Sequence, residues 1–444
     1  GVCGDICGAV LSFFGELRRK IVIKHSNYKM NTRNKVRRAT TSEVVTQRLV
    51  TKKEMESMNS KPCPSKPQRG YVLAEDLKRK IYSKGNGAAK AINFTRPTFL
   101  SSCYDSKSKV SYLGQLFMVC ECIGEGSFGV VYKAFNREDR LSYAIKLVKK
   151  HTSEAANYDE IRCLEKIGEH ENLVTFYLAW EEKNIIYMQL ELCALSLATY
   201  TKTNHKLVNS QLWDIFTDML YAIQHLHRNS LVHLDIKPDN IMMSEDGRYK
   251  LGDFGLLMNL NEAPASLALK AAHTSEGDAK YLAKEVLEGV YSRAADIFSL
   301  GISMLELASD VILPGNGPLW HSLRDGTFCS EYFRLVPSRL RSVITKMMVP
   351  YSEDRPVVDT ILGFNSIKKA TEERHQKSRT NYYAIWRSQN IDEEVQPIAV
   401  CLNPRNTPPR EENSDDEGMG VEPLNASACV TPPKCVSQVI LYTI

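Results

Sequence analysis

The chain has 444 residues, of which 43% are hydrophobic and 25% are charged. These are ordinary values for a globular protein, and they exclude a wholly disordered, collagen-like or membrane-embedded chain. The formal net charge of +5 is spread unevenly, because residues 1–98 carry 21 basic and 7 acidic side chains while the rest of the chain is acidic overall. A basic front on an acidic body is the first indication of domain organisation.

Residues 1–98 are predicted to form a basic, mostly disordered N-terminal tail, because they show little periodic apolar pattern. The exception is the stretch 10–24, where apolar residues fall on one helical face with basic residues beside them. Such a helix can lie on an anionic membrane surface. A signal this short favours the other interpretation, a disordered basic tail with chance apolar residues. The sequence has no run of about 18 apolar residues that would predict a spanning helix.

The 12 cysteines are scattered, without a CxxC pair or the Cys/His spacing of a zinc site. This distribution is typical of free thiols in a reducing compartment. We therefore expect a cytoplasmic protein, with the nucleus as an alternative location.

Between about residues 110 and 368 the pattern changes. Strand-like runs come first, at 117–123, 129–135, 142–148 and 185–192, and helical periodicity follows, at 211–227 and 294–308. Strands followed by helices favour an α+β fold with a small sheet lobe and a larger helical lobe. Residues 369–444 are polar and contain prolines and an acidic run, so they are predicted to be a disordered C-terminal tail.

A glycine-rich run lies between the first two predicted strands. Gly124-Glu-Gly126-Ser-Phe-Gly129-Val-Val131 has GxGxxGxV spacing, in which glycines let the backbone approach phosphates closely. Lys146 follows inside an apolar strand, where lysine is unusual unless it is paired, and where it can hold two phosphates of ATP. Glu160 and Glu165 are the candidate partners. We favour Glu160, because its apolar neighbours place it on a plausible inner helical face.

The strongest motif is His233-Leu-Asp235-Ile-Lys237-Pro-Asp-Asn240, which matches the catalytic-loop pattern H-R-D-L-x-x-x-N except at two positions. Asp235 is expected to accept or orient the proton of a substrate hydroxyl, and Asn240 to bind one Mg²⁺. Asp253, in Asp-Phe-Gly, is expected to hold the metal that bridges the ATP phosphates. These motifs in this order predict ATP and Mg²⁺ as cofactors.

Together the motifs resemble the eukaryotic protein kinase family over about residues 110–368. The resemblance implies a bilobal kinase fold and phosphoryl transfer to a hydroxyl group. The implied catalytic residues are Asp235, Lys237, Lys146 and Glu160, and the implied metal ligands are Asn240 and Asp253. The implied ATP-binding residues are Ile123, Gly124, Glu125, Gly126, Ser127, Phe128, Gly129, Val130, Val131, Ala144, Lys146, Glu191, Cys193 and Met242.

A narrower resemblance is to the Wee/Myt family. It rests on the catalytic loop, on Glu276-Gly-Asp278-Ala-Lys-Tyr281, on Asp296-Ile-Phe-Ser-Leu-Gly301 and on Thr95-Arg-Pro-Thr-Phe99. The intact Asp-Phe-Gly and Leu234 favour the Myt branch. The resemblance implies a cyclin-dependent kinase/cyclin complex as substrate, phosphorylated on the adjacent Thr and Tyr of its glycine-rich loop, and a restraint on mitosis. It also implies peripheral contact with endoplasmic reticulum or Golgi membranes through the basic tail. No recognisable nucleic-acid motif accompanies that tail, so we expect no nucleic acid partner.

Three departures from the family pattern matter. The usual Ala-Pro-Glu is Ala283-Lys284-Glu285, in which Glu285 is still expected to pair with Arg355. Leu234 replaces the arginine that binds a phosphorylated activation loop, so we hypothesise that activity needs no such phosphate. The Myt branch usually has an apolar membrane segment after the kinase domain, and residues 369–444 contain none. The alternatives are a Ser/Thr kinase with another substrate and a pseudokinase scaffold, for which only Lys284 argues.

Overall fold

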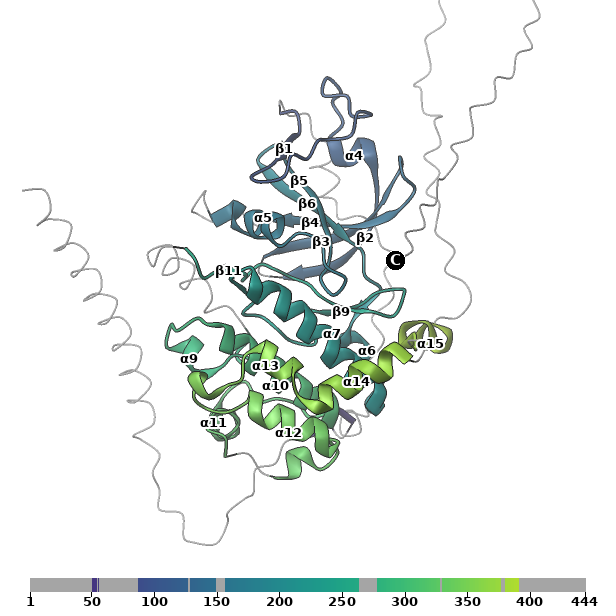
Figure 1. Ribbon diagram of the computed structural model, residues 1–444. Helices are drawn as coiled ribbons and strands as arrows, with labels where there is room; N and C mark the ends of the chain where they lie inside the picture. Colours follow the sequence, from purple (N-terminus) through teal and green to yellow (C-terminus); the bar gives the residue numbers. More distant parts are fainter. Residues whose placement is uncertain are drawn as a thin grey trace, which may run out of the picture. The chain divides into compact units, whose positions relative to one another are not determined.

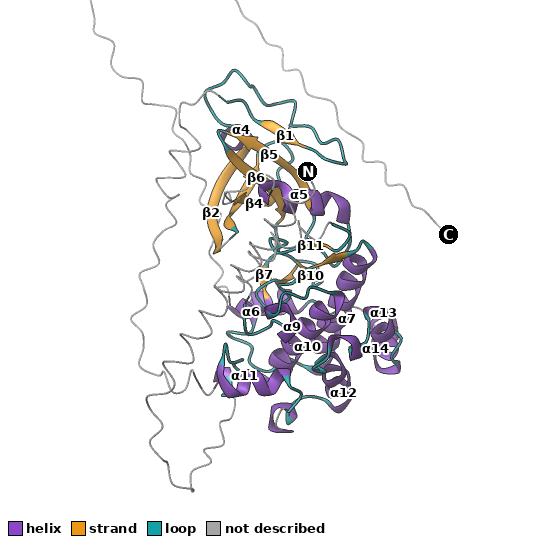
Figure 2. Cartoon of the chain, turned by 90° about the vertical axis from the view of Figure 1, so that its left-hand side faces the viewer, coloured by secondary structure: helices purple, strands orange, loops and turns teal. Residues whose placement is uncertain are grey.

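The computed structural model describes residues 50–53, 55, 87–126, 128–148, 156–262, 278–327, 330–376 and 380–390. In these ranges the chain forms a sheet lobe followed by a helical lobe, as the order of predicted elements indicates (Figures 1 and 2). The α+β bilobal fold predicted from the sequence is therefore confirmed.

An antiparallel sheet of six strands builds the first lobe, in the order β1-β5-β6-β4-β3-β2. Strand β4 lies between β3 and β6, and it is apolar almost throughout because its side chains are buried on both faces of the sheet. Helix α5 lies against the sheet, and the short helix α4 leads into β2 (Figure 1). The elements are β1 (Lys90–Ile92), α4 (Tyr112–Leu116), β2 (Phe117–Gly126), β3 (Gly129–Asn136), β4 (Ser142–Val148), α5 (Ala156–Ile167), β5 (Phe176–Glu182) and β6 (Ile185–Glu191).

A separate aromatic cluster closes the outer part of this sheet. The Trp180 ring stacks on Tyr187 with centroids 5.0 Å apart and on Phe117 at 6.3 Å. Tyr112, in α4, meets the Trp180 ring edge-on at 5.0 Å. These rings are buried, so the segment before β2 belongs to the folded lobe.

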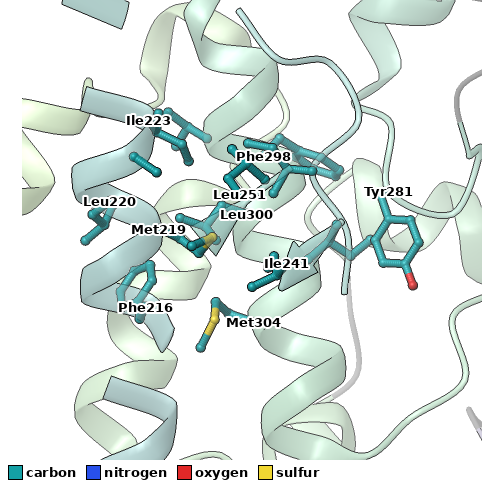
Figure 3. Close-up of a cluster of buried hydrophobic side chains, with 14 of the residues drawn as sticks. Phe216, Met219, Leu220, Ile223, Ile241, Leu251, Tyr281, Phe298, Leu300 and Met304 are labelled. Atoms are coloured by element: carbon teal, nitrogen blue, oxygen red, sulfur yellow. The ribbon is translucent and has the colours of Figure 1, made fainter. Parts of the chain in front are cut away.

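The helical lobe is organised around α7 and α10, whose side chains meet two short strands in the largest core cluster (Figure 3). Helix α10 is apolar on nearly every side, which is the pattern of a helix buried all round. The helices are α6 (Leu197–Tyr200), α7 (Asn209–Arg228), α9 (Lys284–Leu287), α10 (Arg293–Ser309), α11 (Gly317–Arg324), α12 (Ser338–Met347), α13 (Val358–Leu362), α14 (Asn365–Gln376) and α15 (Tyr382–Asn390), with 3₁₀ turns at Ser330–Phe333 and Ser352–Asp354. The strands are β7 (Leu195–Ser196), β8 (Leu231–Val232), β9 (Ile241–Met243), β10 (Tyr249–Leu251) and β11 (Met258–Asn259).

The prediction of a disordered tail from residue 369 is wrong for residues 369–376 and 380–390. Helix α14 runs on to Gln376, and α15 packs Tyr383 and Trp386 against the core of the helical lobe. The indole Nε1 of Trp386 donates to Thr203 Oγ1 across 3.0 Å, and the hydroxyls of Tyr382 and Ser210 are 2.8 Å apart. Three aromatic residues within five positions are too short a signal for periodicity, which explains the error.

Parts of the N-terminal range predicted as disordered are also folded. Strand β1 pairs with the edge strand β5, and Thr51 bridges to Val311 beyond α10. Lys52 Nζ lies 2.8 Å from Glu306 Oε1. A three-residue edge strand and an isolated bridge are stabilised by their partners in the fold and leave little trace in local sequence.

The predicted amphipathic stretch at 10–24 and the acidic run at 411–417 lie outside the described residues. Among the helices that the structure does describe, none has both the length and the apolar character needed to cross a bilayer.

Candidate active site

The glycine-rich run forms the turn between β2 and β3, with Gly126 opposite Gly129. Gly129 has a φ of 158°, and a Cβ there would clash with the carbonyl oxygen of Leu147, so only glycine fits. The ring of Phe128 lies against Gly255, at a place where any Cβ on Gly255 would overlap the ring. The loop therefore folds toward the Asp-Phe-Gly turn. Ser127, predicted to bind ATP, lies outside the described residues.

Lys146 lies between two carboxylates. Its Nζ is 2.6 Å from Glu160 Oε1 and 3.3 Å from Asp253 Oδ1, and its side chain is 5% exposed. Burial alone would lower the pKa of Lys146, but the charges of Glu160 and Asp253 outweigh burial and raise it. The lysine is thus charged, and the structure contains the ion pair with Glu160 that the sequence predicts.

The catalytic-loop sequence lies between β8 and β9 and is tied to the start of α10 by Asp296. The fully buried carboxylate of Asp296 accepts the backbone N–H groups of His233 and Leu234, each at 2.9 Å, and lies 2.9 Å from His227 Nε2. Burial would raise the pKa of Asp296, but the hydrogen bond and charge of His227 hold it below its usual range. Leu234 adopts a left-handed φ of 65° with its side chain buried.

Asp235 is the centre of this loop. Lys237 Nζ lies 2.9 and 2.8 Å from its two carboxylate oxygens. The Asn240 amide nitrogen donates to the Asp235 carbonyl oxygen and to Oδ2, both at 2.8 Å. The carboxylate is 5% exposed and held in one orientation, as positioning a substrate hydroxyl requires.

Asn240 directly precedes β9, and Asp253 follows β10, the strand that pairs with β9. The Gly252 N–H donates to the Asn240 carbonyl at 2.9 Å, and His233 Nε2 lies 3.2 Å from the Gly252 carbonyl. Burial would raise the pKa of Asp253, but the charge of Lys146 holds it below its ordinary value, so its carboxylate is ionised. Because the Asn240 nitrogen donates to Asp235, a metal would take its amide oxygen. Carboxylate and amide oxygens are ligands that fit Mg²⁺.

The lobes are joined at Glu191–Cys193. The Glu191 carboxylate is 2.8 Å from Lys250 Nζ and accepts the Thr175 N–H at 3.1 Å, so its side chain supports the hinge. The backbone of Glu191 and Cys193 is then the part of the hinge that can face an adenine. Burial raises the pKa of the Cys193 thiol to about 12.

The remaining predicted ATP-binding residues lie on the strands above and below this hinge. Met242 belongs to β9 of the helical lobe, and Ile123, on β2, is 47% exposed. The others, on β2, β3 and β4, are Gly124, Glu125, Gly126, Val130, Val131 and Ala144.

The structure contains the predicted pair of Glu285 and Arg355. Arg355 Nη2 donates to Glu285 Oε2 at 3.1 Å, and the guanidinium also bonds the Val349 and Pro350 carbonyls. Lys284 is exposed and lies 3.3 Å from Asp325 Oδ1. Thr274 and Ser275, the possible activation-loop sites, lie outside the described residues.

Two residues of the site were not selected from the sequence. Asp296 was part of a family motif, but its role in tying down the catalytic loop was not assigned. An acidic residue within a long apolar helix is the signal that would have found it, by the argument used for Lys146. Glu165, rejected as the partner of Lys146, binds a different segment and is considered below.

Comparison with known proteins agrees with this geometry. The model of the protein kinase domain matches residues 117–365. The chain is 36% identical to the membrane-associated tyrosine- and threonine-specific cdc2-inhibitory kinase of Drosophila melanogaster, over 73% of this chain and 63% of that protein. It is 41% identical to the Caenorhabditis elegans kinase of the same description named wee-1.3, over 61% of this chain and 40% of the relative.

A second Caenorhabditis elegans relative, wee-1.1, has the same description and is 31% identical over 80% of this chain and 75% of its own length. The chain spans only about two fifths to two thirds of the first two relatives. Protein kinase domains use ATP and a divalent metal, and the charged lysine and the oxygen ligands described above fit both. The chain belongs to the protein kinase family and, within it, to the Wee/Myt group.

Proposed function

We propose that this chain is an ATP- and Mg²⁺-dependent protein kinase that phosphorylates the adjacent Thr and Tyr in the glycine-rich loop of the mitotic cyclin-dependent kinase. Its activity would hold back entry into mitosis. The observation that carries this proposal is the joint presence of an assembled site, with Lys146 between Glu160 and Asp253, and of relatives described as cdc2-inhibitory kinases.

Each side chain then has a defined task. Lys146 holds the first two phosphates of ATP, and Glu160 fixes its position. Asp235 orients the substrate hydroxyl and receives its proton, while Lys237 lies beside the carboxylate and balances its charge. Asn240 and Asp253 would hold Mg²⁺, which would supply charge neutralisation on the phosphates. Catalysis is mostly positioning, which fits a site whose groups are already hydrogen-bonded in place.

The substrate is tested with a purified cyclin-dependent kinase/cyclin complex, with antibodies specific for the phosphorylated Thr and for the phosphorylated Tyr. The wild-type chain should produce both signals and reduce the activity of the complex. Asp235→Asn should produce neither signal. A substrate complex with both residues replaced by Ala and Phe is the matched control. Phosphorylation of generic peptides, with no signal on the complex, would support a Ser/Thr kinase with another substrate and overturn this proposal.

A pseudokinase scaffold is the alternative from another class. Two observations argue against a scaffold. The sequence has every residue that we expect to bind phosphate or metal, and Glu285 is paired with Arg355 although Lys284 replaces the usual proline. Phosphoryl transfer that is lost in Asp253→Ala excludes the scaffold. Absence of transfer in the wild type would favour it.

We further propose that the basic N-terminal region, through its stretch at 10–24, gives the chain peripheral contact with endoplasmic reticulum or Golgi membranes. The proposal is supported by the basic amphipathic stretch at 10–24 and by relatives described as membrane-associated. Co-sedimentation with vesicles containing phosphatidylserine should fall when residues 1–60 are deleted and when salt is raised. Equal sedimentation with and without the tail contradicts the proposal.

A further inference from the structure

Helix α5 carries Glu160, so the ion pair with Lys146 exists only while this helix stays against the sheet. In protein kinases the position of this helix controls whether the pair forms. One usual means of controlling the position of this helix is missing. Leu234 replaces the arginine that would bind a phosphorylated activation loop, and a leucine cannot do so. The structure therefore raises the question of what holds α5 in place.

A segment preceding the kinase domain binds the carboxylate of Glu165 on α5. The Thr95 N–H donates to Glu165 Oε2 at 2.6 Å, the Thr95 hydroxyl at 3.0 Å and the Phe94 N–H at 3.0 Å. The Arg96 N–H lies 3.4 Å from the same oxygen. Although Glu165 is a glutamate, it is only 6% exposed. Hydrogen bonds to a charged, buried acceptor are among the stronger ones in proteins.

The same segment touches two further residues of α5. The Phe94 ring lies under the Arg162 guanidinium, with the guanidinium carbon 4.6 Å from the ring centroid. It also meets the Tyr158 ring edge-on at 6.2 Å. Tyr158, Arg162 and Glu165 are spaced i, i+4 and i+7, so they share one face of the helix.

Glu160 projects from the opposite face. It lies two residues after Tyr158, about 200° around the helix at 100° per residue. Helix α5 is thus held on one face by Lys146 and on the other by the segment around Thr95. An outward movement that separates Glu160 from Lys146 would have to break the bonds to Glu165 as well, because both glutamates belong to one rigid helix.

The segment itself is fixed to the sheet. Strand β1 directly before it pairs with β5, so that Ile92 lies opposite Ala179. Asn93 closes the turn by accepting the Thr98 N–H and donating to the Thr98 carbonyl, both at 2.9 Å. The segment 93–98, which contains the first four residues of the family motif at 95–99, therefore connects α5 to the edge of the sheet.

We infer that Glu165 is a positioning residue for phosphoryl transfer: through the segment 93–98 it keeps α5 where Glu160 can pair with Lys146. The inference rests on the proposed kinase activity. It assigns to the Thr95-Arg-Pro-Thr motif a role in the active state that does not involve the activation loop. Thr95 is exposed, so negative charge introduced there would face the Glu165 carboxylate and release the helix.

The test is a double-mutant cycle that combines Glu165→Ala with Glu160→Gln in the full chain. The dissociation constant of MgATP and kcat for autophosphorylation are measured for each variant. Glu165→Ala should weaken MgATP binding and lower kcat by roughly 10- to 100-fold in total. In a Glu160→Gln background, Glu165→Ala should weaken MgATP binding by less than about twofold further, because its effect passes through the pair already lost. Glu169→Ala, an exposed glutamate beyond the end of the same helix, is the matched control and should leave both values unchanged.

Two surface variants keep the test valid if Glu165→Ala folds poorly. Thr95→Val removes one donor and should reduce kcat a few-fold, whereas Thr95→Glu should approach the effect of Glu165→Ala in a chain that still unfolds cooperatively. Equal losses from Glu165→Ala in both backgrounds, or full activity of Thr95→Glu, would overturn the inference. A wild-type chain that binds no MgATP would overturn the proposed kinase function first, and the inference with it.

Discussion

Arg355 donates to both carboxylate oxygens of Glu285, and the Arg355 side chain is only 1% exposed. Breaking such a pair leaves a buried charge without its partner, which costs about 3–5 kcal/mol. We therefore expect Glu285→Ala to lower the free energy of unfolding by that amount in urea titrations. Lys284 is on the surface, so Lys284→Ala is the matched control and should change stability by less than about 0.5 kcal/mol.

The pairing of Glu285 with Arg355 also predicts that lysine in place of the usual proline at position 284 has little effect on activity. Lys284 is the first residue of α9, a position where proline is well tolerated. Lys284→Pro should therefore change kcat by less than about threefold, whereas Glu285→Ala should reduce it strongly. A large gain of activity in Lys284→Pro would mean that lysine at this position restrains the enzyme.

Substitution of Asp235 should lower kcat, whereas substitution of Asp253 should weaken the binding of MgATP. Asp235→Asn keeps the shape of the loop and its contact with Asn240 but cannot accept a proton, so kcat should fall about 10²–10⁴-fold with MgATP affinity within about twofold of wild type. Asp253→Ala should instead remove the strengthening of nucleotide binding by Mg²⁺. Titrations of ATP with and without Mg²⁺ separate the two. Equal loss of affinity in both variants would contradict the assigned roles.

The sequence predicts these parts of the site because their motifs are local. Lys146 in an apolar strand and Asp235 in its loop are recognisable from their immediate neighbours, and the choice of Glu160 over Glu165 follows from helical spacing. The partners of Glu165 cannot be predicted in this way. Its hydrogen-bond donors lie about 70 residues away in the sequence, and most are backbone N–H groups, which have no residue-specific signal. The same holds for β1 and α15, which are stabilised by distant partners.

Leu234 predicts independence from an activation-loop phosphate. Its side chain is buried and its backbone N–H is bonded to Asp296, so the catalytic loop is positioned by α10. Enzyme treated with phosphatase should keep its kcat within about twofold, and Thr274→Ala with Ser275→Ala should behave alike. Activity that is lost on dephosphorylation and regained on phosphorylation of either residue would refute the hypothesis.

Stability should fall as the solution is acidified below about pH 6.5. Burial lowers the pKa of His233, and nearby carboxylates offset this only in part, whereas the unfolded chain has the ordinary value of about 6.5. Below that pH the unfolded state takes up a proton at His233 more readily than the folded state, so the free energy of unfolding decreases. Urea titrations between pH 7.5 and 5 should show this slope. His233→Gln should make it shallower, and an unchanged slope would exclude His233 as a source.

Cys193 should be slow to react with thiol reagents although it lies at the hinge. The thiolate is the reactive form, and a pKa of about 12 leaves roughly one thiol in 10⁴ ionised at pH 8, against about a quarter at the ordinary value of 8.5. Iodoacetamide at pH 8 should therefore label the exposed Cys120 and Cys122 long before Cys193. Peptide mapping over time measures the three rates. A Cys193 rate equal to that of Cys120 would show that the hinge thiol is open to water and ionises normally, and Cys193→Ser gives the background for that peptide.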